Sequence, residues 1–185
     1  MLYEINTRRL RLAPFCSADV DRCVALANNI NVARMVANIP HPYSRKDAAD
    51  WIGGHEAGRA AGTDFPFAVI LKGEGLIGAI GLHKKGAALF DLGYWLGEPY
   101  WGCGFASEAA RAVMDWARTA LGLREATACY FEDNPASGRV LEKAGFVSTG
   151  AEGRCQSIGR GCNARSISMI WRAAPEAFSS KSGNA

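Results

Sequence analysis

The stretch Trp101-Gly102-Cys103-Gly104-Phe105-Ala106-Ser107-Glu108 decides the fold of this chain, because it joins a strand-like run to a long amphipathic run. The preceding run, 88–96, is rich in β-forming residues, and the following run, 105–121, carries apolar residues on one side and charged residues on the other. Glycines let the backbone approach a ligand closely, and the free amides at a helix start carry about half a positive charge. The stretch therefore predicts an anion site, and a pyrophosphate suits it because successive N–H groups can hold several oxygens without a lysine.

A second strand-like run, 124–131, follows the amphipathic run. The segment from Leu89 to Phe131 thus has the strand, helix, strand pattern of a parallel pair with a right-handed crossover. Ligands of open α/β sheets collect at the carboxyl ends of parallel strands, which favours an anion site over an ordinary tight turn with glycines. Beyond this unit, Asn134 and Pro135 supply an N-cap and a preset first residue for a helix that ends at Gly145.

The other runs complete a mixed α and β pattern. Helical spacing predicts one helix from Ser17, with Ser17 as its cap, and a second from Ser44, where Asp47 completes a variant of the capping box. Further strands are predicted at 7–14, 65–72, 76–84, 146–149 and 165–171, and the segment 150–163 is expected to be a variable loop. The order β-α-α-β-β-β-α-β-α-β-β predicts an α/β (α+β) fold with a mixed central sheet of about seven strands flanked by about four helices.

Composition limits the class of protein. The chain has 185 residues, 49% hydrophobic and 21% charged, so we expect one domain over 1–174 and a polar tail over 175–185. The net charge of +3 is spread along the chain, which argues against nucleic acid as a partner. The sequence contains no apolar run of the roughly 20 residues that cross a bilayer, and its start lacks the features of a secretory signal, so no membrane partner and a cytoplasmic location are expected. The six cysteines and three histidines show no metal-ligand spacing, and no metal is expected.

Three stretches resemble the GNAT superfamily of N-acetyltransferases, specifically its RimJ/RimL-like branch. They are Tyr94-Trp95-Leu96-Gly97, Tyr100-Trp101-Gly102-x-Gly104-x-Ala106-x-Glu108-Ala109 and Asn134-Pro135-Ala136-Ser137-x-x-Val140-Leu141-Glu142-Lys143-x-Gly145-Phe146. The opening Thr7-x-Arg9-Leu10-x-Leu12 is similar too, so the resemblance covers nearly the whole chain. It implies the GNAT fold and an acyltransferase with acetyl-CoA as donor. The implied acceptor is a primary amine, either a protein N-terminus or a small molecule, and the oligomeric state, including a homodimer, stays open.

The resemblance also implies which residues bind the donor. The strand end would pair with the pantetheine arm, the loop would hold the pyrophosphate, and the Asn motif would lie near the thiol. The implied cofactor-binding residues are Trp95, Leu96, Trp101, Gly102, Cys103, Gly104, Phe105, Ala106, Ser107, Asn134 and Ser137. Two positions depart from the family pattern: Trp101 stands where Gln or Arg is usual, and Cys103 stands where a basic residue is frequent. The second departure predicts weaker affinity for the donor, not loss of binding.

Catalytic residues are less clearly marked. Many family members take the proton for the leaving thiolate from a tyrosine, but the matching position here is Leu141. Ser137 is the substitute candidate, with a serine that only binds helix backbone as the alternative. Asp91 aligns with a glutamate that acts as base in some relatives, and a solvent-facing carboxylate is its alternative. A second hypothesis, favoured by the missing tyrosine and by Cys103, is a CoA-binding module that has lost catalysis and serves regulation or assembly.

Two further features have two interpretations each. Tyr94 belongs to an aromatic group beside the proposed site, where it either packs in the core or flanks the acceptor tunnel. Arg139 and Lys143 are one helical turn apart, so they either meet the phosphates of CoA or form a solvated helix face.

Overall fold

The computed structural model describes residues 3–86 and 89–174. The strands are β1 (Ile5–Asn6), β2 (Leu10–Ala13), β3 (Asp64–Leu71), β4 (Gly75–Lys85), β5 (Leu89–Leu96), β6 (Glu125–Phe131), β7 (Val147–Ser157) and β8 (Cys162–Arg172). The helices are α1 (Val20–Ala27), α2 (Ile30–Ala33), α3 (Arg45–Ala60), α4 (Phe105–Ala120) and α5 (Pro135–Lys143), with 3-10 turns η1 (Ser17–Asp19) and η2 (Glu98–Tyr100). The expected tail, 175–185, lies outside the described residues.

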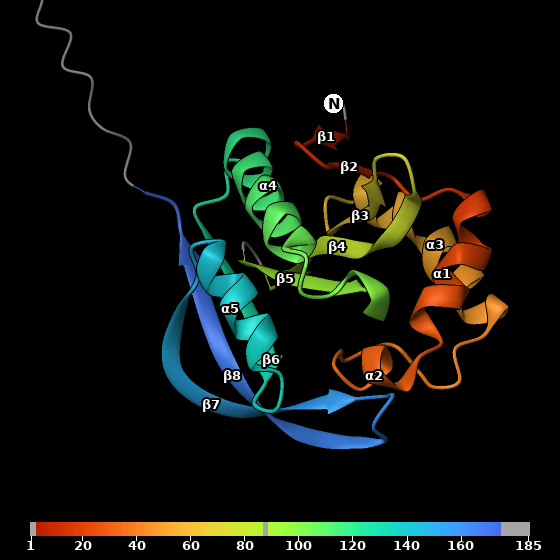
Figure 1. Ribbon diagram of the computed structural model, residues 1–185. Helices are drawn as coiled ribbons and strands as arrows, with labels where there is room; N and C mark the ends of the chain where they lie inside the picture. Colours follow the sequence, from red (N-terminus) through yellow and green to blue (C-terminus); the bar gives the residue numbers. More distant parts are fainter. Residues whose placement is uncertain (1–2, 87–88, 175–185) are drawn as a thin grey trace, which may run out of the picture.

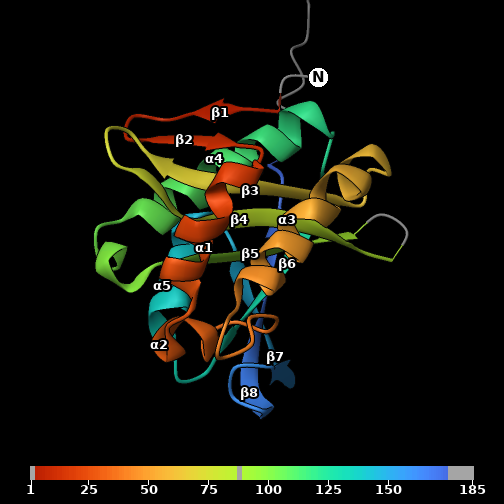
Figure 2. The same ribbon diagram turned by 90° about the vertical axis from the view of Figure 1, so that its right-hand side faces the viewer.

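The described strands form one mixed sheet in the order β1-β2-β3-β4-β5-β6-β8-β7. Neighbours are antiparallel except β5 and β6, which run parallel as the strand, helix, strand pattern predicts. Helices α1 and α3 cover one face of the sheet, and α4 and α5 cover the other (Figures 1 and 2). The predicted α+β fold is confirmed; the sheet has eight described strands because the short β1 adds to its edge, and α2 is a helix that the sequence pattern did not indicate.

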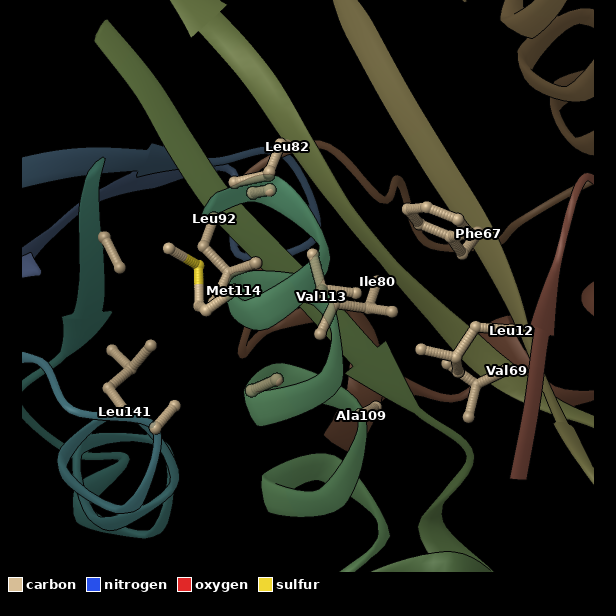
Figure 3. Close-up of a cluster of buried hydrophobic side chains, with 14 of the residues drawn as sticks. Leu12, Phe67, Val69, Ile80, Leu82, Leu92, Ala109, Val113, Met114 and Leu141 are labelled. Carbon is tan, nitrogen blue, oxygen red and sulfur yellow. The ribbon is translucent and has the colours of Figure 1, made fainter. Parts of the chain in front are cut away.

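Apolar side chains fill both interfaces between the sheet and its helices. Under α4 and α5, fully or almost fully buried residues from strands and helices interdigitate, among them Leu12, Phe67, Ile80, Leu92, Val113, Met114 and Leu141 (Figure 3). A second cluster lies under α1 and α3 and includes Val20, Cys23, Ala27, Ala48 and Ala68. Because both faces are packed, the positions of the strand ends and helix starts are fixed where the site forms.

Of the two helix caps predicted for the first half of the chain, one is present in the structure and the other is not. Ser44 and Asp47 make the predicted capping box: the Ser44 N–H donates to the Asp47 carboxylate at 2.8 Å, and the Asp47 N–H donates to the Ser44 hydroxyl at 3.2 Å. The prediction that Ser17 caps the first helix is wrong. Ser17 lies inside the turn η1, and the Asp19 carboxylate accepts from the Cys16 N–H at 2.8 Å instead.

The segment 150–163 is not the variable loop that its glycines suggested. It forms the long hairpin of β7 and β8, whose register runs from Glu152 opposite Ile167 to Ser157 opposite Cys162. The hairpin tip packs on the segment after α2, where the Ile158 N–H donates to the Ala37 carbonyl at 2.9 Å. Cross-strand hydrogen bonds and this docking satisfy the backbone, so the intrinsic turn preference of glycine does not decide the structure.

Candidate active site

Strands β5 and β6 form a fork at the centre of the sheet. In the described chain their pairing is confined to two positions, Phe90 opposite Ala126 and Asp91 opposite Thr127, after which the strands diverge. A cavity of about 480 Å³ opens beyond the fork, between the starts of α4 and α5 and the segment around α2. Its lining residues are Val32, Met35, Val36, Tyr94, Trp95, Leu96, Tyr100, Trp101, Gly102, Gly104, Phe105, Ala106, Ser107, Asn134, Ala136, Ser137, Arg139, Val140 and Lys143.

The loop before α4 has the conformation of an anion-binding turn. Gly102 and Gly104 take φ values of 74° and 79°, a backbone conformation that favours glycine because a Cβ atom would be strained there. Gly104 is the N-cap of α4, so the amides of the first helical turn begin directly after it and lie along the cavity. Free amides and the positive end of the helix dipole therefore face the same space, which suits a phosphate group.

Arg9 and Glu108 hold this loop and are not among the residues that line the cavity. The Glu108 carboxylate accepts from the Thr7 hydroxyl at 2.7 Å, the Arg9 N–H at 2.9 Å and the Arg9 Nε at 2.7 Å. Arg9 Nη1 also donates to the Cys103 carbonyl at 3.0 Å. Desolvation raises the pKa of Glu108, but the hydrogen bonds from Thr7 and Arg9 and the Arg9 charge outweigh it and leave this pKa below its ordinary value. The carboxylate is thus ionised and ties the turn between β1 and β2 to the first turn of α4.

Trp101 connects the same loop to the end of β5. Its indole Nε1 donates to the Leu96 carbonyl at 2.8 Å, while 42% of the residue remains exposed. The Leu96 carbonyl therefore has a partner within the chain. A tryptophan at this position, in place of the usual Gln or Arg, acts as a brace between strand and loop.

Ser137 and Tyr94 both line the cavity, and their hydroxyl groups are in contact. Asn134 caps α5, its side-chain oxygen accepting from the Ser137 N–H at 3.3 Å, and this places Ser137 in the first helical turn. The Ser137 Oγ lies 2.6 Å from the Tyr94 Oη of β5. Leu141 is fully buried in the core cluster under α4 and α5 (Figure 3) and is not among the residues that line the cavity. The phenol nearest Ser137 in the described structure thus comes from a strand, not from α5.

Asp91 lies at the base of the fork and outside the cavity lining. Its carboxylate accepts from the Thr127 hydroxyl at 2.7 Å and pairs with the Lys85 ammonium at 3.2 Å. Its side chain is 20% exposed, so it is neither a fully solvated carboxylate nor one surrounded by apolar groups. The geometry permits a role in proton transfer at the fork only if an acceptor or a water reaches this point.

The cavity brings together ten of the eleven predicted cofactor-binding residues: Trp95, Leu96, Trp101, Gly102, Gly104, Phe105, Ala106, Ser107, Asn134 and Ser137. Cys103 is exposed and not part of the lining; its contribution to the site is the carbonyl that Arg9 holds. Arg139 and Lys143 line the cavity although the sequence equally suggested a solvated face. With Ala136 and Val140 they repeat every three or four residues, and this spacing marks the cavity-facing side of α5.

Sequence patterns did not indicate the opposite wall, formed by Val32, Met35 and Val36. These residues reach the cavity only because the β7–β8 hairpin holds the segment after α2. Another cavity, of about 510 Å³, lies near the C-terminal ends of α3 and α4 and is lined by Tyr3, Glu56, Arg59, Ala60, Phe65, Trp116 and Leu121. Helix C-termini carry partial negative charge, so this second cavity does not suit a phosphate.

Residues 3–86 and 89–174 lack two further features, a metal-binding cluster and a membrane-spanning helix. This part of the chain has no cluster of three or more His, Cys, Asp or Glu side chains that could hold a metal ion. It also contains no helix that is both long and apolar enough to cross a membrane.

A parallel fork beside a helix start with free amides has a geometry that suits a phosphate-bearing ligand. Residues 9–147 match the family described as "Acetyltransferase (GNAT) domain", so the chain belongs to this family of acetyltransferases. The chain is 40% identical over 77 residues to the uncharacterized N-acetyltransferase YoaA of Bacillus subtilis (strain 168), a match that covers 40% of this chain and 44% of YoaA. It is 27% identical over 154 residues to YnaD of the same organism, covering 82% of this chain and 87% of YnaD. The expected enzyme class, an N-acetyltransferase, is confirmed.

Solved structures share the fold. RimL, described as a ribosomal L7/L12 alpha-N-protein acetyltransferase in complex with coenzyme A, superimposes with a TM-score of 0.80 at 18% identity, covering 91% of this chain and 97% of RimL. Mycobacterium smegmatis RimJ, in complex with CoA-disulfide, gives a TM-score of 0.80 at 18% identity and covers 92% and 87%. The microcin C7 self-immunity acetyltransferase MccE, in complex with acetyl-CoA and AMP, gives 0.77 at 16% identity and covers 90% and 94%. At these identities the likeness concerns the fold, and the expected RimJ/RimL-like architecture is confirmed.

Proposed function

We propose that this chain transfers the acetyl group of acetyl-CoA to a primary amine, by direct attack of the amine on the thioester in a ternary complex. One observation carries the proposal: a single cavity joins the amides at the start of α4, the β5–β6 fork and the Ser137 hydroxyl. A donor with phosphates at one end and a thioester at the other matches this order. The loop would bind the pyrophosphate, Trp95 and Leu96 would flank the pantetheine, and Asn134 and Ser137 would lie near the thioester.

Positive charge for the donor phosphates comes from α5. Arg139 and Lys143 face the cavity, and the Arg111 Nε donates to the Lys143 carbonyl at 2.6 Å, which ties the end of α5 to α4. These two cations supply the charge that Cys103 cannot. Because exposed charges are screened by salt, we expect donor affinity to fall as ionic strength rises.

Acyl transfer requires a neutral amine, donors for the oxyanion of the thioester and a proton for the departing thiolate. Ser137 is our candidate for the last role, as acid or as hydrogen-bond donor to the thiolate. Asp91 is our candidate base, acting through water at the fork. The alternative is an amine that binds neutral and releases its proton to solvent, which would need no base.

The acceptor would enter from the side of α2 and the β7–β8 hairpin. Arg160, at the hairpin tip, pairs with both oxygens of Asp133 at 2.8 and 2.9 Å and stacks on the Phe131 ring at 4.6 Å. This contact holds the hairpin against the loop that leads into α5. The wall of Val32, Met35 and Val36 favours an acceptor with an apolar part next to its amine. RimL is described as acting on a protein N-terminus, whereas MccE was solved with the small molecule AMP, so both acceptor classes are retained.

Thermal-shift titration tests the donor. A ligand at 100 times its Kd stabilises the native state by about 2.7 kcal/mol, which raises the Tm of a chain of this size by roughly 5–10 °C. We expect acetyl-CoA and CoA to raise the Tm, and dephospho-CoA to raise it less. Substituting Arg139 and Lys143 by Gln should reduce the rise in Tm with both CoA and dephospho-CoA, because both ligands carry the pyrophosphate. A Tm that stays unchanged with all three ligands would refute the proposal.

Thiol release from acetyl-CoA then separates an enzyme from the alternative, a CoA-binding module without catalysis. The acceptors to screen are small amines, amino acids and short peptides with free N-termini. Saturable release with any of them excludes the inert module. Donor binding without release across the panel would favour it.

A further inference from the structure

Tyr94 and Ser137 are joined by a hydrogen bond between their hydroxyl groups. The Tyr94 Oη lies 2.6 Å from the Ser137 Oγ and 3.1 Å from the Ser137 carbonyl oxygen. Both residues line the cavity, one from β5 and the other from α5. A phenol thus reaches the proposed acid from the facing strand, whereas the family position for a tyrosine on α5 holds the core residue Leu141.

A serine hydroxyl alone is a poor proton source, because losing its proton leaves an alkoxide. A phenol loses a proton more readily, since its charge spreads over the ring. Burial raises the pKa of Tyr94 to about 12, so this phenol is protonated at neutral pH and keeps a proton to give. Hydrogen-bonded hydroxyls also polarise one another when they form a chain in a partly buried site.

We propose that Tyr94 is the second member of a two-hydroxyl relay, which polarises Ser137 and returns to it the proton that Ser137 gives to the CoA thiolate. This inference rests on the proposed function. In the step, the amine nitrogen forms a bond to the thioester carbon and the carbon–sulfur bond breaks with its electron pair on sulfur. The Ser137 Oγ–H proton moves to sulfur, and the Tyr94 Oη–H proton moves to Ser137. The proton lost by the amine passes to solvent, and solvent returns one to Tyr94, so protons balance over the cycle.

The two hydroxyls are held in register before any ligand binds. Tyr94 lies opposite Ile80 in the paired part of the sheet, and its ring packs against the core cluster under α4. Ser137 is fixed by the Asn134 cap. Donors that are already oriented need no reorganisation during the reaction, which is the usual source of electrostatic catalysis.

The test uses the CoA complex of the full chain and needs no acceptor. The ionisation constant of the bound thiol is measured by ultraviolet absorbance, as the difference between complexes with CoA and with desulfo-CoA, which cancels the cysteines of the protein. Tyr94→Phe removes one hydroxyl, and Tyr130→Phe is the matched control because the Tyr130 ring packs against the same helix at Gly138. We expect Tyr94→Phe to lower the ionisation constant about fivefold, the worth of one ordinary hydrogen bond, and Tyr130→Phe to leave it unchanged.

The double variant distinguishes a relay from two separate contacts. Ser137→Ala should lower the constant at least as much as Tyr94→Phe, and Tyr94→Phe added to Ser137→Ala should change it no further. If Tyr94 only holds α5 in place, its variant will alter unfolding or CoA affinity but leave the bound thiol as in the wild type, and that result overturns the relay. Calorimetric titration of the wild type with CoA tests the proposed function separately from the relay. If the wild type does not bind CoA, the proposed function is wrong.

Discussion

Glu108 is the residue whose loss should most clearly show how the donor loop is held. In the wild type, the two carboxylate oxygens of Glu108 accept three hydrogen bonds from Thr7 and Arg9. Glu108→Gln keeps the size of the side chain, removes its charge and replaces one of these acceptor oxygens by an NH2 group, which cannot accept. Hydrogen bonds to a charged group contribute about 1.5–3 kcal/mol each, and one amide oxygen can retain part of this set. The expected loss is therefore about 2–3 kcal/mol of unfolding free energy.

The donor should also bind more weakly to this variant. Arg9 links Glu108 to the Cys103 carbonyl, so without the carboxylate the loop loses one fixed hydrogen bond. A loss of about 1 kcal/mol corresponds to a roughly fivefold higher Kd for CoA. Urea unfolding measures the first effect, and calorimetric titration with CoA measures the second.

Glu125→Gln is the matched control. Glu125 pairs with Arg172 at 2.9 Å on the exposed surface, and such pairs contribute about 0–1 kcal/mol. The pKa of Glu108 is lowered in the folded state, so its contribution is present above the unfolded pKa and lost as pH falls. The difference between wild type and Glu108→Gln should accordingly shrink below about pH 4.5. Equal effects of the two substitutions at pH 7, on stability and on CoA binding, would refute the anchoring argument.

Three further predictions concern proton transfer and stability. Ser137→Ala should lower kcat about 100-fold or more with little change in CoA affinity, and unchanged turnover would exclude Ser137 as acid. Asp91→Asn should lower kcat with little change in CoA affinity, whereas a kcat equal to that of the wild type would remove Asp91 from the mechanism. Burial lowers the pKa of His55 to about 4 in the folded chain, whereas its pKa in the unfolded chain is about 6.5. As the pH falls below about 6.5, the unfolded chain therefore binds a proton at His55 before the folded chain does. The free energy of unfolding should fall by about 3 kcal/mol by pH 4. The stability difference between wild type and His55→Leu, measured by urea unfolding from pH 7 to 4, should change by this amount; a constant difference would contradict it.

Part of the site could be predicted because its signals are local. Gly102 and Gly104 need positive φ values, and Asn134 with Pro135 starts a helix wherever the chain places it. The same holds for the Ser44 and Asp47 capping box. Strands were expected at 146–149 and 165–171, but their continuation through 150–163 was missed, because the glycines of this segment favour a turn locally and pairing between β7 and β8 outweighs that preference.

The amino-acid order by itself determined the strand, loop and helix that present backbone amides to an anion, since these depend on residues close together in the chain. Tertiary structure decided what surrounds them. Arg9 meets Glu108 across 99 positions, and Tyr94 meets Ser137 across 43. Val32, Met35 and Val36 become a wall of the cavity only after the distant hairpin docks beside them. Contacts of this kind leave no periodicity in the sequence, because they arise when packing brings separate elements together and fixes the direction of each side chain.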